Sequence, residues 1–319
     1  MPTTFNMESP GNKITTSDGA LSNYTGVTRV ASSAVVDFSH TSRAFTATPR
    51  PELRRDYTEI RPPADSRGIH RLDKEHPMPI ETNSLHPVES LLAPVRHSTH
   101  PYLTWYSQTG ERVELSGRVF DNWVAKSANL LHEEFDLAPG SVVATDMPGH
   151  WKSAALLLAC WHLGAEVRWV APGTDPGAVD VFITADPQTL AVGGAVEVIV
   201  VPLPALAMAF GGPLPVGATD YASEVRSYAD SFSSFPIDTS ATALTSETGT
   251  LSYIDLFASG TPDQEAGTTL VGTALPLDRV IQTVLAQWIA GNPVVLVEEG
   301  VAITDSLLTG ERVTTRLDL

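Results

Sequence analysis

The chain has 319 residues, a formal net charge of −17 and a single cysteine. A protein this acidic lacks the basic surface that binding to nucleic acid requires, and one cysteine cannot form an intramolecular disulfide or a cysteine-built metal site. No apolar run is long enough to span a membrane, because four prolines interrupt the run at residues 196–216. We therefore expect a cytoplasmic protein with no nucleic-acid partner, no membrane span and no bound metal.

The N-terminal quarter differs from the rest of the chain. Residues 1–81 contain ten basic and ten acidic side chains, whereas residues 82–319 contain ten basic and 27 acidic ones. The first part is rich in Ser, Thr, Pro and Arg, so it cannot bury enough apolar surface to offset its ordering entropy. We predict a disordered extension over residues 1–80 and a folded domain over residues 81–319. A transit peptide is disfavoured by six acidic residues, and initiation at Met78 would leave the extension untranslated.

Patterns of regular secondary structure begin near residue 81. An apolar period of 3.6 predicts helices and an apolar alternation predicts strands. Ser116 is suited to cap the second helix, and Gly164 to end the third. In chain order, we predict a helix at residues 88–95 and a β-hairpin of strands 102–106 and 112–115. A helix at 117–135, a strand at 141–146 and an apolar helix at 151–163 follow.

The second half of this region continues the alternation. Three buried strands come first, and a long stretch follows in which only a strand near Ala243 is predicted. A helix and a last strand complete the region. The three strands are predicted at residues 167–170, 179–184 and 196–201, the helix at 277–289 and the last strand at 293–297. Strands that alternate with helices indicate an α/β domain with a mostly parallel sheet flanked by helices.

Three blocks in this order resemble the N-terminal part of AMP-binding, adenylate-forming enzymes, which include acyl-CoA synthetases, luciferases and peptide-synthetase adenylation domains. The blocks are Tyr102–Leu131, Leu137–Ala165 and Ala274–Val297. The second is the most similar, with Pro139-Gly-Ser-Val-Val-Ala before a Met-Pro turn and an apolar helix that ends in Gly-Ala. The resemblance implies the α/β fold of an N-terminal subdomain of these enzymes. The chain is also similar to short actinobacterial proteins that match only this portion.

The resemblance also implies a phosphate-binding loop, for which the family uses Gly, Ser and Thr followed by Lys. This chain has Thr245-Ser-Glu-Thr-Gly-Thr-Leu251 at the matching position. Thr245, Ser246, Thr248 and Gly249 are the candidate remnant, with ATP or AMP as weakly bound ligands. Glu247 places a carboxylate where phosphate should lie, and the chain has no Lys after Lys152.

The sequence therefore predicts a truncated, catalytically silent relative, a pseudoenzyme with a binding or regulatory role and a small molecule or a protein as its partner. Two observations support this prediction. The family's Pro-Leu-X-His segment reads Pro276-Leu-Asp-Arg279, and the chain stops before the family's adenine-binding, Mg-binding and ribose-binding motifs. The alternative is a partial ligase that another chain completes in trans. The histidines are all at or before His162, and we expect His150 and His162 to be structural rather than metal ligands.

Overall fold

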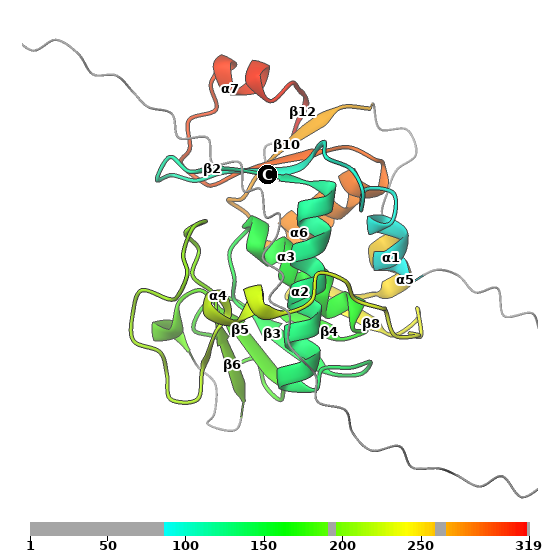
Figure 1. Cartoon of the computed structure of the whole chain (residues 1–319), viewed down its shortest axis with the longest axis vertical. Coiled ribbons are helices and arrows are strands. Elements are labelled where there is room, and N and C mark those ends of the chain that lie inside the picture. The colour runs from blue at the N-terminus through cyan, green and yellow to red at the C-terminus, as the bar shows by residue number, and fades with distance from the viewer. Residues whose placement is uncertain (1–85, 191–195, 259–265, 318–319) are drawn as a thin grey trace, which may run out of the picture. The chain divides into compact units, whose positions relative to one another are not determined.

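The structure is a computed structural model that describes residues 86–190, 196–258 and 266–317. The extension predicted over residues 1–80 lies outside the described residues, so the division of the chain at residue 80 stays a prediction. The α/β fold with helix-flanked, mostly parallel sheets is confirmed. However, the described strands form two sheets, where the sequence indicated one (Figure 1).

The larger sheet contains seven strands in the order β7-β6-β5-β3-β4-β8-β9. All neighbouring pairs are parallel except β8 and β9, which form an antiparallel hairpin. In chain order the strands are β3 (Val142–Thr145), β4 (Glu166–Trp169), β5 (Val181–Thr184), β6 (Glu197–Val200), β7 (Thr219–Asp220), β8 (Thr242–Ser246) and β9 (Gly249–Ser252).

The smaller sheet joins the two ends of the described region. Its order is β12-β10-β11-β1-β2, and only the β1–β2 hairpin is antiparallel. Leu103 of β1 lies opposite Val294 of β11 in the parallel register. The two paired residues are almost 200 positions apart in the sequence. The strands are β1 (Pro101–Tyr106), β2 (Arg112–Ser116), β10 (Thr268–Gly272), β11 (Val294–Val297) and β12 (Val313–Leu317).

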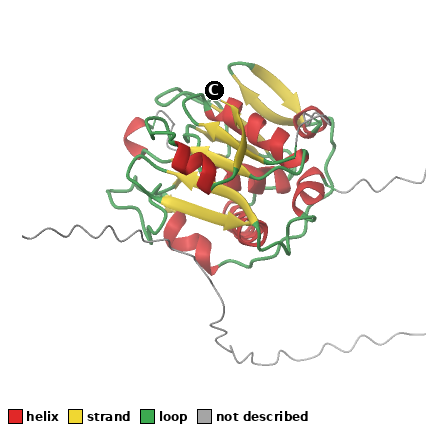
Figure 2. Ribbon diagram, turned by 90° about the horizontal axis from the view of Figure 1, so that it is seen from above, coloured by secondary structure: helices red, strands yellow, loops and turns green. Residues whose placement is uncertain are grey.

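Helices lie on both sides of the strands (Figure 2), and α2, α3 and α6 lie between the two sheets (Figure 1). The predicted cap Ser116 accepts a hydrogen bond from the Val119 amide at the start of α2. Gly164 follows α3 with φ +79°, and a Cβ there would lie 2.7 Å from Ile237 Cγ2. The helices are α1 (Pro87–Leu92), α2 (Gly117–Phe135), α3 (Trp151–His162), α4 (Tyr221–Glu224), α5 (Tyr253–Phe257), α6 (Leu277–Ile289) and α7 (Asp305–Gly310), with 3-10 turns at Pro187–Thr189 and Val225–Ser227.

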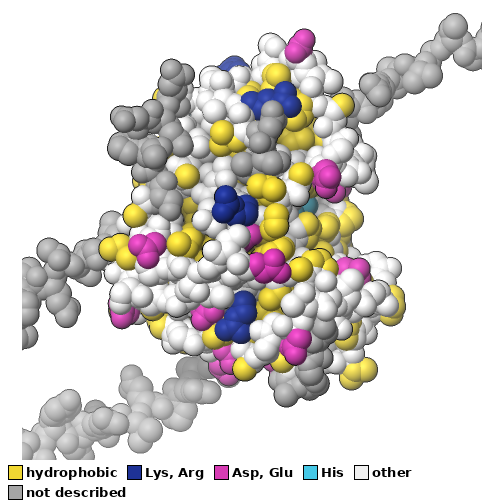
Figure 3. Space-filling view, turned by 180° about the vertical axis from the view of Figure 1, so that it is seen from behind, with side chains coloured by type: hydrophobic (Ala, Val, Ile, Leu, Met, Phe, Trp, Pro, Cys, Tyr) yellow, Lys and Arg dark blue, Asp and Glu magenta, His cyan; other side chains and the backbone are white. Residues whose placement is uncertain are grey.

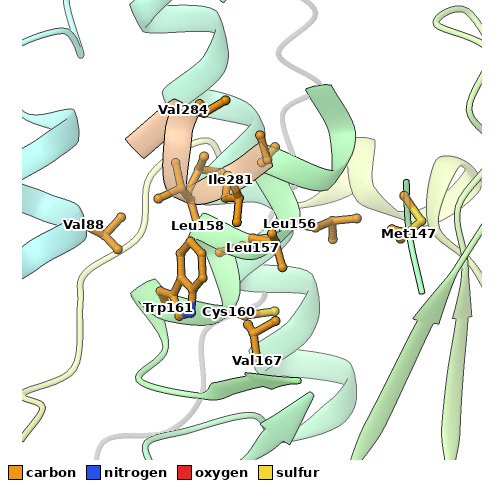
Figure 4. Packing of buried hydrophobic residues seen from close by; sticks show 14 of the residues in the cluster. Val88, Met147, Leu156, Leu157, Leu158, Cys160, Trp161, Val167, Ile281 and Val284 are labelled. Atoms are coloured by element: carbon orange, nitrogen blue, oxygen red, sulfur yellow. The ribbon is translucent and has the colours of Figure 1, made fainter. Parts of the chain in front are cut away.

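Helix α3 is the centre of the core, because every one of its residues is buried. Figure 4 shows its apolar side chains between Val88 of α1, Ile281 of α6 and Val167 of β4. A helix that is apolar all round requires partners on every side, which two sheets and three neighbouring helices supply. None of the described helices has the length and hydropathy to cross a bilayer. On the surface, Figure 3 shows Asp and Glu side chains scattered among uncharged ones.

Candidate functional site

The segment predicted as a phosphate-loop remnant forms the tip of the β8–β9 hairpin. Ser246 of β8 lies opposite Gly249 of β9, so Glu247 and Thr248 form a two-residue turn. Gly249 has φ +130°, in the region of backbone conformation that side chains rarely adopt. The structure therefore brings Thr245, Ser246, Thr248 and Gly249 together, but at a tight hairpin whose backbone groups pair across two strands.

The tip of the hairpin is hydrogen-bonded to the N-terminal end of α6. The acceptor is a buried carboxylate that the sequence did not indicate as a site residue. Asp278, in the first turn of α6, is 2% exposed. It accepts hydrogen bonds from Ser246 Oγ at 2.7 Å and from Thr248 Oγ1 at 3.0 Å. The N-terminal end of a helix favours a negative charge, and the Pro276 N-cap supplies no side-chain cap. Asp278 is therefore the acceptor of both hydroxyls at the tip of the hairpin.

A signal for Asp278 was present in the sequence, because an acidic residue in the first turn of a predicted helix is typical of a capped N-terminus. Its hydroxyl partners lie 30 and 32 positions earlier, however, and no local pattern relates them. Asp278 is the residue that the structure adds to the site.

Charged side chains of both signs occur around the hairpin. Glu247 is exposed at the turn, and Arg279, the residue after Asp278, is exposed on the first turn of α6. The two lysines that the structure describes are engaged elsewhere. Lys126 donates to the carbonyls of Arg226 and Tyr228, and Lys152 to those of Pro202 and Pro204, with burial lowering the pKa of Lys152 to about 8.

The two histidines singled out from the sequence lie at opposite ends of α3. His150 caps the helix, since its Nδ1 accepts a hydrogen bond from the Lys152 amide at 3.0 Å. His162 ends the same helix, about 18 Å away at 1.5 Å per residue, and packs against the Phe232 ring. Within the described ranges, no group of three or more His, Cys, Asp or Glu side chains could hold a metal ion.

Comparisons with known proteins agree with the fold. No protein-family model matches the chain. A TIGR03089 family protein of Mycobacterium tuberculosis is 40% identical over 136 residues, which cover 41% of this chain and 54% of that protein. The chain thus spans about half the length of the curated relative it matches.

Solved structures of adenylate-forming enzymes are similar to most of the chain. The acyl-CoA synthetase of Brucella canis matches with a TM-score of 0.61 at 17% identity, covering 73% of this chain and 47% of the enzyme. The inhibitor-bound N-terminal domain of FACL13 from M. tuberculosis has a TM-score of 0.52 at 16% identity, covering 73% of this chain and 62% of that domain. Acetoacetyl-CoA synthetase from Streptomyces lividans gives 0.51 at 17% identity, over 70% and 40% respectively. The chain therefore resembles the N-terminal portion of these enzymes and has its fold.

Proposed function

We propose that this chain, built on the N-terminal fold of adenylate-forming enzymes, is a catalytically silent and truncated relative with a binding or regulatory role in the cytoplasm. Its partner in this proposal is a small molecule or another protein.

One observation carries the proposal, namely that the hydroxyls of Ser246 and Thr248 donate to Asp278 inside the protein. A phosphate-binding loop must turn its donors toward the ligand oxygens, whereas here both hydroxyls donate to a buried carboxylate. A polyphosphate brought to the hairpin would also meet Glu247, and like charges at about 4 Å repel by roughly 1 kcal/mol even in water. The cation that would offset this repulsion has no candidate among the described lysines, which hydrogen-bond carbonyls elsewhere.

Weak nucleotide binding at the hairpin is the second part of the proposal. Thr245, Ser246, Thr248 and Gly249 are the residues that would contact ATP or AMP. Binding would require the hydroxyls of Ser246 and Thr248 to exchange Asp278 for phosphate. Such an exchange gains little, because hydrogen bonds to one anion are replaced by hydrogen bonds to another.

The alternative function is a partial adenylate-forming ligase that a second polypeptide completes. The observation in its favour is coverage, since the chain matches 47% of the B. canis acyl-CoA synthetase. In this case the second chain would have to bring the cation to the hairpin.

The decisive experiment is acid-dependent exchange of pyrophosphate into ATP, measured on the full chain with a panel of carboxylic acids. We expect no exchange above the rate without protein, both for the unaltered chain and for the Glu247→Gly, Asp278→Asn double variant. Exchange by the unaltered chain alone would disprove catalytic silence. Exchange that appears only after a second polypeptide is added would favour the alternative.

A further inference from the structure

Helix α1 begins at a histidine, where Ser, Thr, Asp or Asn is the usual capping residue. His86 is the N-cap, and its Nδ1 accepts a hydrogen bond from the Val88 amide at 3.2 Å. A ring nitrogen that accepts a hydrogen bond carries no proton, so the proton of the neutral imidazole is on Nε2. If His86 binds a second proton, Nδ1 becomes a donor that faces another donor, and the cap of α1 is lost.

A second buried histidine lies beside this cap. His162, at the end of α3, is 2% exposed, and its ring centroid lies 5.6 Å from that of His86. We call these two residues the histidine pair. Neither ring nitrogen of His162, nor His86 Nε2, has a hydrogen-bond partner among the described residues. A proton added to His162 would therefore be buried without an acceptor and close to a second imidazolium.

The charged side chains nearest the histidine pair already form hydrogen bonds with one another. Glu89 of α1 accepts from Arg96 through both carboxylate oxygens, at 2.6 and 2.9 Å, and this lowers the pKa of Glu89. Arg96 Nε also donates to Asp121 of α2 at 2.9 Å. His162 Nε2 lies 3.7 Å from Glu89 Oε2, which is too long for a hydrogen bond. The nearest carboxylate is thus neutralised by a guanidinium before any imidazole is protonated.

Aromatic rings face the histidine pair from two further elements. The Tyr253 ring of α5 lies 6.4 Å from that of His86, and the Phe232 ring lies 5.1 Å from that of His162. Burial raises the pKa of the Tyr253 hydroxyl far above its usual range, so this group supplies no negative charge. Burial lowers the pKa of His86 and of His162 to about 4, although Glu89 acts in the opposite direction. A packed α1 therefore resists two protons that a released α1 would bind near pH 6.5.

Helix α1 is short enough to leave the surface without the rest of the protein. It has six residues, and isolated helices below about 12 residues are marginal in water. Its buried side chains are Val88, Leu91 and Leu92. Figure 4 shows Val88 directed toward Leu158 and Trp161 of α3. The helix thus depends on its cap and on this apolar contact.

The same capping chemistry at α3 has a different consequence. His150 Nδ1 accepts from the Lys152 amide, as His86 Nδ1 accepts from the Val88 amide. Every residue of α3 is buried, however, so α3 cannot leave without unfolding of the core. Loss of the cap can release α1 alone.

From the histidine cap, the unpaired nitrogens of the buried histidine pair and the shortness of α1, we propose that α1 is a helix that acid releases. Protonation of His86 and His162 removes the cap, separates α1 from α3 and leaves both sheets folded. Release exposes the apolar face formed by Val88, Leu91 and Leu92. This inference does not depend on the proposed function, because none of these residues belongs to the β8–β9 hairpin.

Hydrogen exchange of the full chain at pH 7.5, 6 and 5, followed by mass spectrometry and corrected for the intrinsic pH dependence of exchange, tests the proposal. The peptide that spans α1 contains the Ser90 and Ala93 amides, which donate to the His86 and Glu89 carbonyls. A histidine whose pKa is 4 when α1 is packed and 6.5 when it is released favours release by roughly thirtyfold at pH 5.

We expect the protection of α1 to fall at least tenfold between pH 7.5 and pH 5. The strands β3 and β5 should remain at least tenfold better protected than α1 at pH 5, because the opening is local. A smaller fall at α1, or equal protection of α1 and these strands at pH 5, would overturn the proposal.

Three variants assign the effect to the histidine pair. His86→Asn keeps a side-chain acceptor at the N-cap that does not titrate, so α1 should stay packed and lose part of its pH dependence. Adding His162→Leu should reduce the fall in protection to less than threefold. His97→Asn, at an exposed histidine on the connection from α1 to β1, should behave as the unaltered chain does. A double variant that keeps the full fall in protection would refute the role of the pair.

Discussion

The two ends of α6 differ in whether the buried polar group beside them has a hydrogen-bond partner. At the first turn, Asp278 is buried but has two hydroxyl donors from the β8–β9 hairpin. At the last turn, Trp288 packs against Tyr102, whose buried hydroxyl has no partner within the described ranges. An external ligand of the hairpin must therefore displace internal hydrogen bonds, whereas the Tyr102 hydroxyl is enclosed by the protein and stays without an acceptor there. The resemblance to adenylate-forming enzymes directs attention to the hairpin, where the buried carboxylate is already hydrogen-bonded.

The largest effect of a single substitution is expected at Trp288, which packs against both Tyr102 and Phe120. Trp288 is 3% exposed, and Trp288→Ala should lower the free energy of unfolding by about 3–5 kcal/mol, the usual cost of a large cavity. Urea denaturation followed by circular dichroism measures this change. Trp288→Phe is the milder control and should keep most of the stability. A loss below about 1 kcal/mol for Trp288→Ala would show that the stacked rings of Tyr102 and Trp288 are not part of a tightly packed core.

Acidification should destabilise the side of the molecule that holds α1 and α3. Burial lowers the pKa of His86 and of His162 to about 4, and that of His150 to about 3. Nearby charges act in both directions, since Glu89 raises the pKa of His86 and His162 while Lys152 lowers that of His150.

The unfolded chain takes up protons at these histidines near pH 6.5, but the folded chain resists until about pH 4, so stability is full above pH 6.5 and falls as the pH drops toward 4. Each histidine contributes roughly 3 kcal/mol over that range. Urea denaturation at pH 7.5, 6 and 5 measures the slope, and His162→Leu should reduce it. A stability that rises on acidification would contradict the prediction.

At the hairpin end, the carboxylate should matter less for stability, because its partners are on the surface side of the fold. Asp278→Ala removes the acceptor of both hydroxyls and should cost about 1–2 kcal/mol. Asp278→Asn retains one acceptor oxygen and should cost less. The measurement is the urea midpoint of each variant. If Asn and Ala cost the same, the hydrogen bonds to Ser246 and Thr248 do not stabilise the hairpin.

The smallest effect concerns nucleotide binding. Glu247 is exposed, so Glu247→Gly should change stability by less than about 0.5 kcal/mol. It removes a charge that repels phosphate and should tighten ATP binding by up to about fivefold, the equivalent of roughly 1 kcal/mol. Isothermal titration with ATP measures this, with Glu298→Gly as a control at an acidic residue outside the hairpin. If ATP binding stays unmeasurable in the variant, the hairpin is not a remnant of a phosphate-binding loop.

The sequence by itself determined those helices and strands whose buried face follows from the spacing of apolar residues within the element. The predicted helix at residues 277–289 matches α6 at both ends, and the predicted strands at 141–146, 167–170, 179–184 and 196–201 correspond to β3, β4, β5 and β6. These segments could be predicted because an apolar period records which face of an element is buried. The resemblance to the N-terminal part of adenylate-forming enzymes rests on the same segments.

Only the tertiary structure decided which elements meet. β1 pairs with β11 in a second sheet, where the sequence indicated one sheet, and the hairpin places the expected phosphate loop against Asp278. The aromatic cluster likewise combines Tyr102 of β1, Phe120 of α2 and Trp288 of α6. A periodic pattern states that a side chain is buried but not against what, because hydrogen bonds and packing between distant residues depend on the path of the whole chain. For that reason the sequence predicted the scaffold, while the partner of Ser246 and Thr248 and the unpaired hydroxyl of Tyr102 emerged only from the folded protein.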